Sequence, residues 1–264
     1  MTWDPAVYLK YGGERTRPAA DLLARVPVIE PQNVVDLGCG PGNSTALLAA
    51  RWPSAHITAI DADPAMLDRA WRSGPRCRYL QADIAAWRPE QPPDVIFSNA
   101  VLHWLDDHPV LFPRLMRALP PGGVLAVQMP RNFDAPSHAL LRQVARGGPW
   151  AATLEPLLRD HPVAEPQVYH RWLAPLCAAL EIWETTYLVR LSGADPVLSW
   201  MRGTSLRPLL DALEPKVAAM YEAAYAERLR EAYPREPDGV TLFPFRRLFI
   251  VATRAEETEE EGDQ

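Results

Sequence analysis

The first half of the chain alternates short apolar runs with longer segments of mixed apolar and polar character. The longer segments, at 44–51, 64–71 and 110–119, each have a proline at or just beyond one end, as helices often do. The apolar runs have the length and composition of strands, and they occupy residues 33–37, 55–60, 76–80, 94–98 and 124–129. Strands that alternate with helices predict a parallel sheet with helices on both faces. Such a sheet binds its ligands at the carboxyl ends of the strands, near the point where the strand order reverses.

The second half follows a different pattern. Residues 135–180 have helical periodicity that proline often interrupts, and residues 196–233 are helical again. A strand-like segment precedes this second helical stretch, at 181–191, and another follows it, at 239–252. We therefore expect a helical insertion of about forty residues between the last two strands. The predicted fold is therefore α/β, a doubly wound and mostly parallel Rossmann-like sheet with a helical cap in the C-terminal half.

We divide the chain into four segments. An N-terminal helical segment (1–30) is expected over the active site, and the α/β core follows it (31–134). The cap region with the last two strands comes next (135–254). The final segment (255–264) is an acidic tail that is too charged and too poor in apolar residues to fold.

The net charge of the chain comes from this tail. The chain has 33 acidic and 27 basic residues and a formal net charge of −6, but six of the acids lie among the last nine residues. The other 27 acids balance the 27 bases, whereas nucleic-acid-binding domains carry a strong basic excess. No apolar run is long enough to span a membrane. We therefore expect a monomer that binds neither nucleic acid nor membrane.

Cysteine usage points to a reducing compartment. Cys39, Cys77 and Cys177 are odd in number and far apart in the sequence. No CxxC pair or Cys/His cluster occurs, so neither a disulfide framework nor a metal site is predicted. The first residues also lack the charged and apolar regions of a secretory signal. We expect a cytoplasmic protein without bound metal.

A glycine motif joins the first predicted strand to the first predicted helix, in the sequence DLGCGPG at 36–42. Glycine at alternate positions lets a ligand approach the backbone closely. The GxGxG spacing differs from the GxGxxG fingerprint that places a pyrophosphate at a helix N-terminus, and this disfavours NAD. S-adenosylmethionine (SAM) has no phosphate but carries an ammonium group, which an acid before the glycines suits directly or through water. The predicted cofactor-binding residues of this motif are Asp36, Gly38, Cys39, Gly40 and Gly42.

Polar side chains also follow the next three strands. Asp61 ends the second strand, where its carboxylate can accept hydrogen bonds from both ribose hydroxyls of an adenosine. Asp83 can accept from an adenine amino group while Ile84 packs on the ring. Each polar residue has a simpler alternative: Asp61 as the cap of the following helix, Asp83 as a loop acid, and Asn99 as a turn residue. The predicted cofactor-binding residues here are Asp61, Ala62, Asp83, Ile84 and Asn99.

This set of motifs resembles that of class I SAM-dependent methyltransferases, over roughly residues 34–128. A second resemblance, to the trans-aconitate 2-methyltransferase family, spans nearly the whole chain before the acidic tail. It rests on residues 3–5 (WDP) with Tyr8, 14–18 (ERTRP), 99–104 (NAVLHW), 128–132 (QMPRN), 200–204 (WMRGT) and 243–252 (FPFRRLFIVA).

The family resemblance implies a substrate and a product. It implies an O-methyltransferase that forms a monomethyl ester of trans-aconitate or a related tricarboxylate, with S-adenosylhomocysteine as the spent cofactor. The sequence departs from the family pattern at Arg131, where we expect an acid before Asn132. Because that position is expected near the mouth of the substrate site, the departure leaves the preferred acid open.

A carboxylate acceptor needs little chemical activation. Its reference pKa is about 4, so it is ionised at pH 7 and no strong base is required. Holding the oxygen in line with the methyl carbon can supply roughly 7–11 kcal/mol of the barrier. An acid with several carboxylates also needs fixed cations, and arginine pairs with carboxylates bidentately. The candidate cations are Arg15, Arg17, Arg202, Arg246 and Arg247.

Two of these candidates exclude one another. Arg246 and Arg247 are adjacent in a predicted strand, so their side chains point to opposite faces and only one can reach a given cavity. Aromatic and histidine side chains could close the site and donate hydrogen bonds. We assign catalytic roles to His103 and Tyr11 and substrate-binding roles to Tyr8, Arg17, Trp104, Arg202, Arg246 and Arg247.

Several other functions are alternatives. The enzyme could methylate another small carboxylate or an acyl-carrier-bound diacid, although a carrier would need a basic rim that the neutral body does not favour. A non-catalytic SAM-binding protein would bind the cofactor without turnover of any small acid. A nucleic-acid methyltransferase is disfavoured by the charge balance, and a serine hydrolase by the lack of a GxSxG motif.

Overall fold

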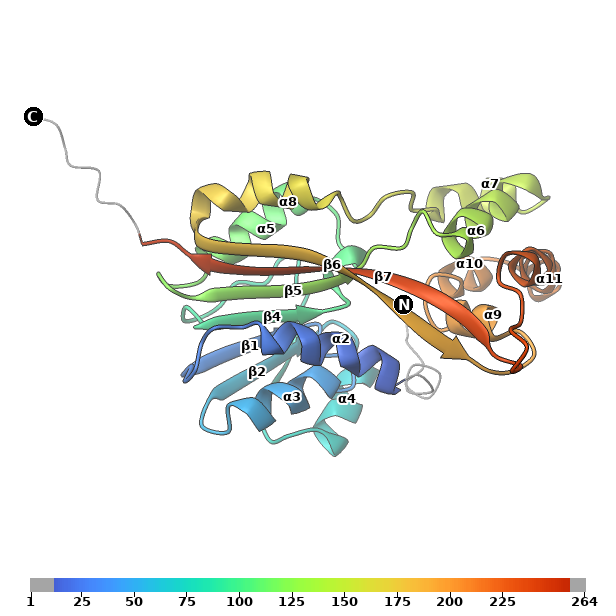
Figure 1. The fold of residues 1–264 in the computed structure, drawn as a ribbon. Coiled ribbons are helices and arrows are strands. Elements are labelled where there is room, and N and C mark those ends of the chain that lie inside the picture. The colour runs from blue at the N-terminus through green and yellow to red at the C-terminus, as the bar shows by residue number, and fades with distance from the viewer. Residues whose placement is uncertain (1–11, 257–264) are drawn as a thin grey trace, which may run out of the picture.

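A single sheet runs through the molecule. The computed structural model describes residues 12–256 of the 264-residue chain, with side chains from Thr16 onward. The sheet has seven strands in the order β3-β2-β1-β4-β5-β7-β6 (Figure 1). The strands are β1 (Asn33–Leu37), β2 (His56–Asp61), β3 (Arg78–Gln81), β4 (Val95–Asn99), β5 (Val124–Pro130), β6 (Cys177–Leu191) and β7 (Thr241–Arg254).

The strand directions follow from the connections. The first five strands pair in parallel, whereas β7 is antiparallel to both β5 and β6. Long helical crossovers permit parallel neighbouring strands. The last pair, β6 and β7, is antiparallel, so the chain leaves the sheet at the end of β6 and returns to the same edge at the start of β7. The predicted α/β fold with a doubly wound, mostly parallel sheet is confirmed.

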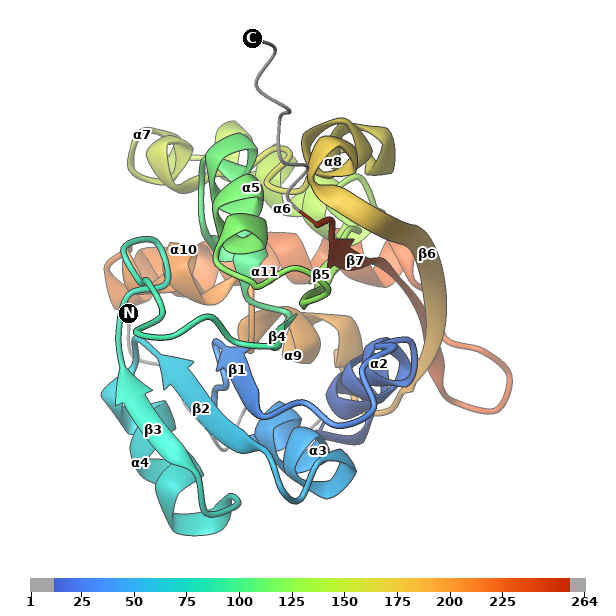
Figure 2. The same cartoon turned by 90° about the vertical axis from the view of Figure 1, so that its left-hand side faces the viewer.

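Helices cover both faces of the sheet. On one face lie α2 (Gly12–Ala24), α3 (Asn43–Arg51) and α4 (Pro64–Ser73), and on the other lie α5 (His108–Arg117) and α8 (Pro166–Leu173) (Figure 2). Adjacent strand residues separate accordingly: Val34 packs in the core with α2 and α3, while Val35 packs in the core with α5 and α8. Burial on both faces explains why the central strands are apolar at nearly every position rather than alternating.

The reversal of strand order creates a crevice at the carboxyl ends of the strands. β1 pairs with β2 on one side and with β4 on the other. The loops that leave β1 and β4 therefore diverge to opposite sides of the sheet. This is the position at which open α/β sheets bind ligands.

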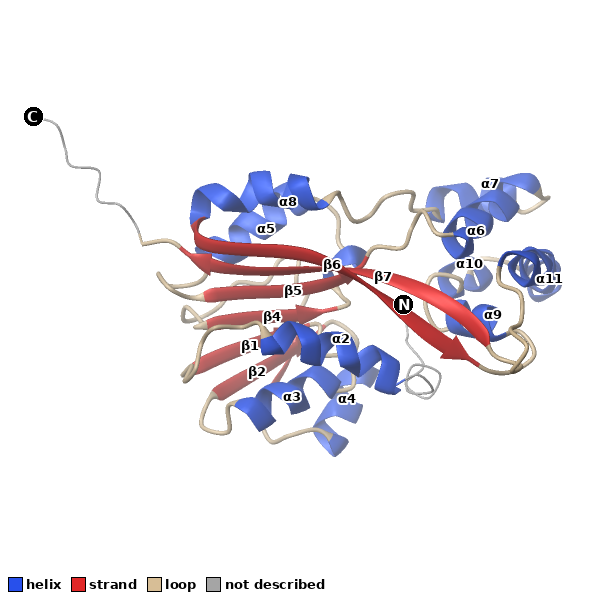
Figure 3. Ribbon diagram, viewed as in Figure 1, coloured by secondary structure: helices blue, strands red, loops and turns tan. Residues whose placement is uncertain are grey.

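A helical cap lies beyond the carboxyl end of β5 (Figure 3). It contains α6 (Pro136–Gly147), α7 (Ala151–Leu154), η2 (Glu155–Leu157), α9 (Pro196–Arg202), α10 (Arg207–Asp211) and α11 (Pro215–Ala232). β6 and β7 are twice as long as β5, at 15 and 14 residues against 7. Because β5 pairs with β7 only from Arg247 onward, the first half of β7 extends past the sheet and supports the cap. Two further short helices are η1 (Leu102–Trp104) and η3 (Ala174–Leu176).

The predicted elements agree with the structure to within a few residues at most boundaries. One assignment is wrong: residues 177–180, expected to be helical, begin β6 and pair with the end of β7. Pairing at the edge of the sheet outweighs the local helical pattern of this segment. The four-segment division of the chain stays a prediction, and the acidic tail from 257 onward lies outside the described residues.

Candidate functional site

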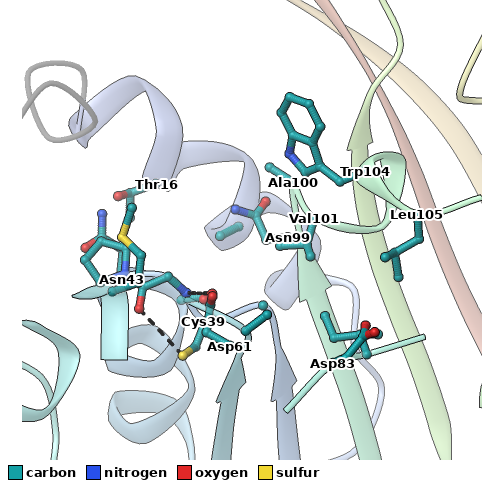
Figure 4. A pocket seen from close by; sticks show the side chains of 18 residues that line it. Thr16, Cys39, Asn43, Asp61, Asp83, Asn99, Ala100, Val101, Trp104 and Leu105 are labelled. Carbon is teal, nitrogen blue, oxygen red and sulfur yellow. Dashed lines mark hydrogen bonds between the residues drawn. The ribbon is translucent and has the colours of Figure 1, made fainter. Parts of the chain in front are cut away.

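A cavity of about 240 Å³ opens at the carboxyl ends of β1, β2 and β4 (Figure 4). α2 contributes Thr16 and Ala19 to its wall, and η1 contributes Trp104. We call it the donor cavity. Of the ten cofactor residues predicted from the sequence, eight line it: Gly38, Cys39, Gly40, Asp61, Ala62, Asp83, Ile84 and Asn99.

The glycine turn requires glycine for two different reasons. Gly38 has a φ of +75°, and a Cβ there would lie 2.3 Å from the side chain of Val101, so a larger residue cannot fit. Gly40 also has a positive φ, of +53°, but a Cβ there would meet no atom within 4 Å. Open space beside a backbone in this conformation is what the close approach of a ligand needs.

Two predicted cofactor residues lie outside the wall of the donor cavity. Gly42 precedes α3 with a φ of +93° and forms the junction between turn and helix. Asp36 is fully buried beneath the turn, where its Oδ2 accepts hydrogen bonds from the hydroxyls of Ser44 (2.8 Å) and Thr45 (2.7 Å). Burial raises the pKa of Asp36 to about 6. Ser44 itself lines the cavity, so Asp36 borders the site through this hydroxyl.

Asp61 connects the second strand to the glycine turn. Its Oδ2 accepts a hydrogen bond from the Gly40 amide at 2.9 Å, and its Oδ1 accepts one from the Asp63 amide at 2.9 Å. Burial raises the pKa of Asp61. The N-cap of α4 is Asp63, which accepts from the amides of Ala65 and Met66. The carboxylate of Asp61 therefore faces the cavity rather than capping the helix.

Asp83, Ile84 and Asn99 also line the donor cavity. Asp83 accepts a hydrogen bond from the Ala85 amide at 2.9 Å, and Ile84 is buried beside it. The side-chain oxygen of Asn99 is buried and has no hydrogen-bond partner among the described residues. Sequence reasoning missed the other lining side chains, which include Thr16, Asn43, Ser44, Met66 and Leu105.

A second and larger cavity, of about 590 Å³, lies between the sheet and the cap. We call it the acceptor cavity. Ala100 and Trp104 line both cavities, so the two meet at the turn after β4. Much of the remaining wall is apolar and comes from the cap and the sheet, including Leu141, Leu157, Trp200, Leu209 and Phe245.

Three arginines line the acceptor cavity, and only one was among the predicted cations. Arg247 lies on β7, is buried, and donates a hydrogen bond to Oε1 of Gln128 at 3.1 Å. Arg142 lies on α6 and Arg159 in the segment after η2. No sequence motif marked Arg142 or Arg159, because arginine is common throughout this chain.

Three of the other predicted cations, Arg17, Arg202 and Arg246, do not line either cavity. Arg202 forms a two-bond ion pair with Glu222, with its Nε 2.5 Å from Oε1 and its Nη2 2.8 Å from Oε2. Arg246, on the opposite face of β7 from Arg247, donates to the Arg131 carbonyl at 2.8 Å. Arg17 has a side chain that is 73% exposed, and it contacts Asp21 and the ring of Tyr187. Each of these arginines is held by a partner in the folded chain.

Arg131, the position at which the sequence departs from the family pattern, also lies outside both cavities. Its side chain is buried, pairs with Glu165 and with Glu184 (Nη1 to Oε1, 2.6 Å), and donates to the Ala164 carbonyl at 3.2 Å. It therefore fixes the end of β5, next to the lining residues Pro130 and Asn132.

His103 and Trp104 are adjacent at the boundary between the two cavities. Their rings lie 4.8 Å apart between centroids. His103 is buried and lines the acceptor cavity, and its Nδ1 has no hydrogen-bond partner among the described residues. Burial and the nearby guanidinium groups of Arg159 and Arg247 hold the pKa of His103 well below its usual value. The imidazole is therefore neutral at pH 7. Tyr8 and Tyr11, and the side chain of Arg15, lie outside the described part of the structure.

Residues 12–256 have neither a metal-binding cluster nor a helix suited to cross a membrane. In that range, no group of three or more histidine, cysteine or acidic side chains is arranged to hold a metal ion. No helix there has both the length and the apolar character needed to cross a bilayer. The three cysteines are all free thiols.

Comparison with known sequences places this chain among methyltransferases. A family described as a methyltransferase domain matches residues 34–123. The chain is 51% identical over 253 residues to the trans-aconitate 2-methyltransferase of Azoarcus sp. (strain BH72), covering 96% of this chain and 99% of that protein. It is 52% identical over 253 residues to the protein of the same name from Methylobacterium nodulans, covering 96% and 98%.

Comparison with solved structures supports the fold. The YcgJ protein from Bacillus subtilis superposes with a TM-score of 0.57 at 12% identity, over 91% of this chain and 99% of that one. Phosphoethanolamine N-methyltransferase 2 of Haemonchus contortus, in complex with phosphomonomethylethanolamine and S-adenosylhomocysteine, gives a TM-score of 0.55 at 16% identity, over 91% and 53%. At these identities the likeness concerns the fold alone.

Proposed function

This chain belongs to the trans-aconitate 2-methyltransferase family, and on that basis we propose that it methylates one carboxylate of trans-aconitate to a monomethyl ester, with SAM as the donor. The observation that carries the proposal is the pair of cavities. They meet at Ala100 and Trp104. Acids line the donor side, whereas three arginines and a single acid, Asp106, line the acceptor side. A cationic donor and an anionic acceptor are thereby each matched to the charge of their own cavity.

The donor cavity has the polar groups that SAM requires. Asp61 accepts hydrogen bonds from the ribose hydroxyls, and Asp83 with Ile84 holds the adenine. The buried, unpartnered oxygen of Asn99 is a hydrogen-bond acceptor for the ammonium group. The open backbone at Gly40 leaves room for the methionine part. SAM supplies a methyl carbon that is already activated by its bond to a positively charged sulfur.

The acceptor cavity orients an ion that is already reactive. Arg247 binds a carboxylate at the sheet side, and the ring of Trp104 excludes water at the boundary. His103 is neutral, so its N–H donates a hydrogen bond to the carboxylate being methylated instead of removing a proton from it. Orientation then lowers the barrier, as expected for an acceptor that needs no base. Tyr8 and Tyr11 remain predicted contributors to this site.

We place the enzyme in the cytoplasm as a monomer that uses no metal and binds neither nucleic acid nor membrane. The free state of the three cysteines supports a reducing compartment. The substrate chemistry supports the lack of a metal, because an ionised carboxylate and a sulfonium react without a Lewis acid.

The direct test is turnover with methyl-labelled SAM and trans-aconitate, scored as methyl ester by mass spectrometry. We expect one ester per acid molecule. Asp61→Ala should weaken SAM affinity at least tenfold by calorimetry, because about two charge-assisted hydrogen bonds are lost, and Asp61→Asn should weaken it less. If the chain binds SAM but methylates no di- or tricarboxylic acid, it is a SAM-binding protein of another kind.

A further inference from the structure

The cap side of the acceptor cavity carries its own pair of cations. Arg142 on α6 and Arg159 after η2 both line the cavity. Arg247 comes from the sheet instead. A ligand in this cavity can therefore contact guanidinium groups from two separate parts of the fold.

The two cap arginines are held by acids that are much more exposed than they are. Arg159 donates to the His103 carbonyl and to Oδ1 of Asp106, both at 2.7 Å, and Nε of Arg142 lies 3.1 Å from Oδ1 of Asp160. The side chains of Arg142 and Arg159 are 12% and 31% exposed, whereas those of Asp160 and Asp106 are 52% and 93% exposed. Water screens the acids more than the arginines, so the field inside the cavity stays positive.

A buried amide at the same cavity lacks partners. Asn132 is 2% exposed, and neither its Nδ2 nor its Oδ1 has a hydrogen-bond partner among the described residues. Leaving the polar atoms of a buried amide without hydrogen bonds costs free energy. Asn132 is among the residues that line the cavity with the arginines, and its NH₂ group is suited to donate to a carboxylate.

We propose that Arg142, Arg159 and Asn132 form an anion subsite that recognises a non-reacting carboxylate of the acceptor, separate from the carboxylate held by Arg247. This inference rests on the proposed function. It assigns one carboxylate to the boundary at Trp104, one to Arg247 and one to this subsite. A tricarboxylate fills all three positions, and a dicarboxylate leaves one empty, so the subsite selects for a third carboxylate.

A substitution of Asp106 should change acceptor binding in the opposite direction to a substitution of the arginines. Asp106 lines the same cavity and occupies one N–H of Arg159. An incoming carboxylate must compete with Asp106 for that N–H and is repelled by its charge. Neutralising Asp106 should therefore improve acceptor binding, whereas a purely structural ion pair between Asp106 and Arg159 predicts that the same change impairs it.

The experiment compares four acids in the full-length enzyme. Trans-aconitate is measured beside glutaconate, itaconate and mesaconate, each of which lacks a different one of its three carboxylates. Arg159→Ala and Arg142→Ala should each lower kcat/KM for trans-aconitate about 10- to 100-fold, mainly through KM, as expected for lost hydrogen bonds to a charged group. For one dicarboxylate, the same one for both variants, the loss should be less than about threefold, because its missing carboxylate is the one bound here.

The controls separate recognition from folding. Arg146→Ala removes a neighbouring arginine of α6 that also pairs with Asp160 but does not line the cavity, and it should leave all four acids unaffected. Arg159→Lys keeps the charge and should recover part of the loss. Asp106→Asn should lower KM for trans-aconitate about threefold, and SAM affinity should be unchanged in every variant.

Two results would overturn the subsite. One is an equal loss for all four acids in Arg142→Ala and Arg159→Ala, and the other is a higher KM in Asp106→Asn. Either would make these arginines structural. Lack of turnover in the wild type would instead reject the proposed function itself, so the two failures are distinct.

Discussion

The donor and acceptor cavities are neighbours, but they are built in different ways. In the donor cavity, most of the predicted residues lie at or just after the carboxyl end of a strand. Asp61 and Asn99 end β2 and β4, and Gly38 and Asp83 follow β1 and β3 within two residues. The acceptor cavity takes its arginines from α6, from the segment after η2 and from β7, which are separated by up to about a hundred residues. The donor cavity therefore follows from local turns, and the acceptor cavity from long-range packing.

The two cavities also differ in what holds their side chains in place. In the donor cavity, the Asp61 carboxylate accepts hydrogen bonds from the backbone amides of Gly40 and Asp63. In the acceptor cavity, Arg142 is held by the Asp160 carboxylate, and Arg159 by the Asp106 carboxylate together with the His103 carbonyl. Backbone donors are fixed once the turn forms, whereas partners on side chains can be exchanged for a ligand. Substitutions in the donor turn should therefore have the larger effects.

The largest effect is expected for Gly38→Ala. The new Cβ would lie 2.3 Å from the side chain of Val101, in a backbone with a φ of +75°. The turn must shift, and a shift of about 1 Å in a binding site can reduce catalysis about 100-fold or more. We expect at least that loss in kcat/KM for SAM, with a matching loss of SAM affinity by calorimetry.

Gly122→Ala is the matched control for this substitution. Gly122 has nearly the same φ, of +77°, but a Cβ there meets no atom within 4 Å. Gly122→Ala should therefore lower the free energy of unfolding only by the cost of a left-handed backbone, about 1–2 kcal/mol. This loss should appear as a lower Tm. Equal loss of SAM affinity in both variants would show that backbone strain, and not the clash with Val101, dominates.

A second substitution separates two adjacent residues of the acceptor side. Arg247→Ala should lower kcat/KM for trans-aconitate about 50-fold, because hydrogen bonds to a charged group contribute about 1.5–3 kcal/mol each. Arg246→Ala removes a side chain that faces away from the cavity and bonds the Arg131 carbonyl, and its effect should stay within about threefold. Steady-state kinetics at saturating SAM measure both. A larger effect in Arg246→Ala would place the substrate on the other face of β7.

The smallest effect concerns pH, because a buried acid lies beneath the donor turn. Burial raises the pKa of Asp36 to about 6 from 3.8 in its unfolded state. Between these values the folded chain keeps a proton that the unfolded chain has released, so stability falls as pH rises. The difference in unfolding free energy, wild type minus Asp36→Asn, should therefore decrease by about 1.4 kcal/mol per pH unit in this window.

His138 on the acceptor side shows the opposite trend. Burial lowers the pKa of His138 to about 4 from 6.5, so its contribution to stability is lost as pH falls through this range. Because both proteins contain His138, its contribution cancels in the difference between wild type and Asp36→Asn. Urea unfolding of the ligand-free chain between pH 4 and 6 measures that difference. A difference that is flat with pH would mean that Asp36 is ionised throughout.

The sheet, the glycine turn and the acids at the strand ends could all be predicted from the order of residues along the chain. These features depend on short-range rules. Apolar runs must be buried, a turn with positive φ favours glycine, and the residue after a strand must lie at its carboxyl end. This is why eight of the ten predicted cofactor residues line the donor cavity. Asp36 and Gly42 are the two exceptions. Hydroxyls on α3 draw the Asp36 carboxylate under the turn, and Gly42 joins the turn to the helix.

The arginines that line the acceptor cavity could not be predicted in the same way, because the folding of the whole chain selects them. Sequence alone does not distinguish an arginine that lines a cavity from one that does not. The role of each arginine depends on whether a nearby acid pairs with it and keeps it out of the cavity. Glu222 holds Arg202 from twenty positions away, while the crossing of β7 under the cap brings Arg247 into the cavity and directs Arg246 out of it. Such pairings depend on distances that exist only once the cap has packed on the sheet.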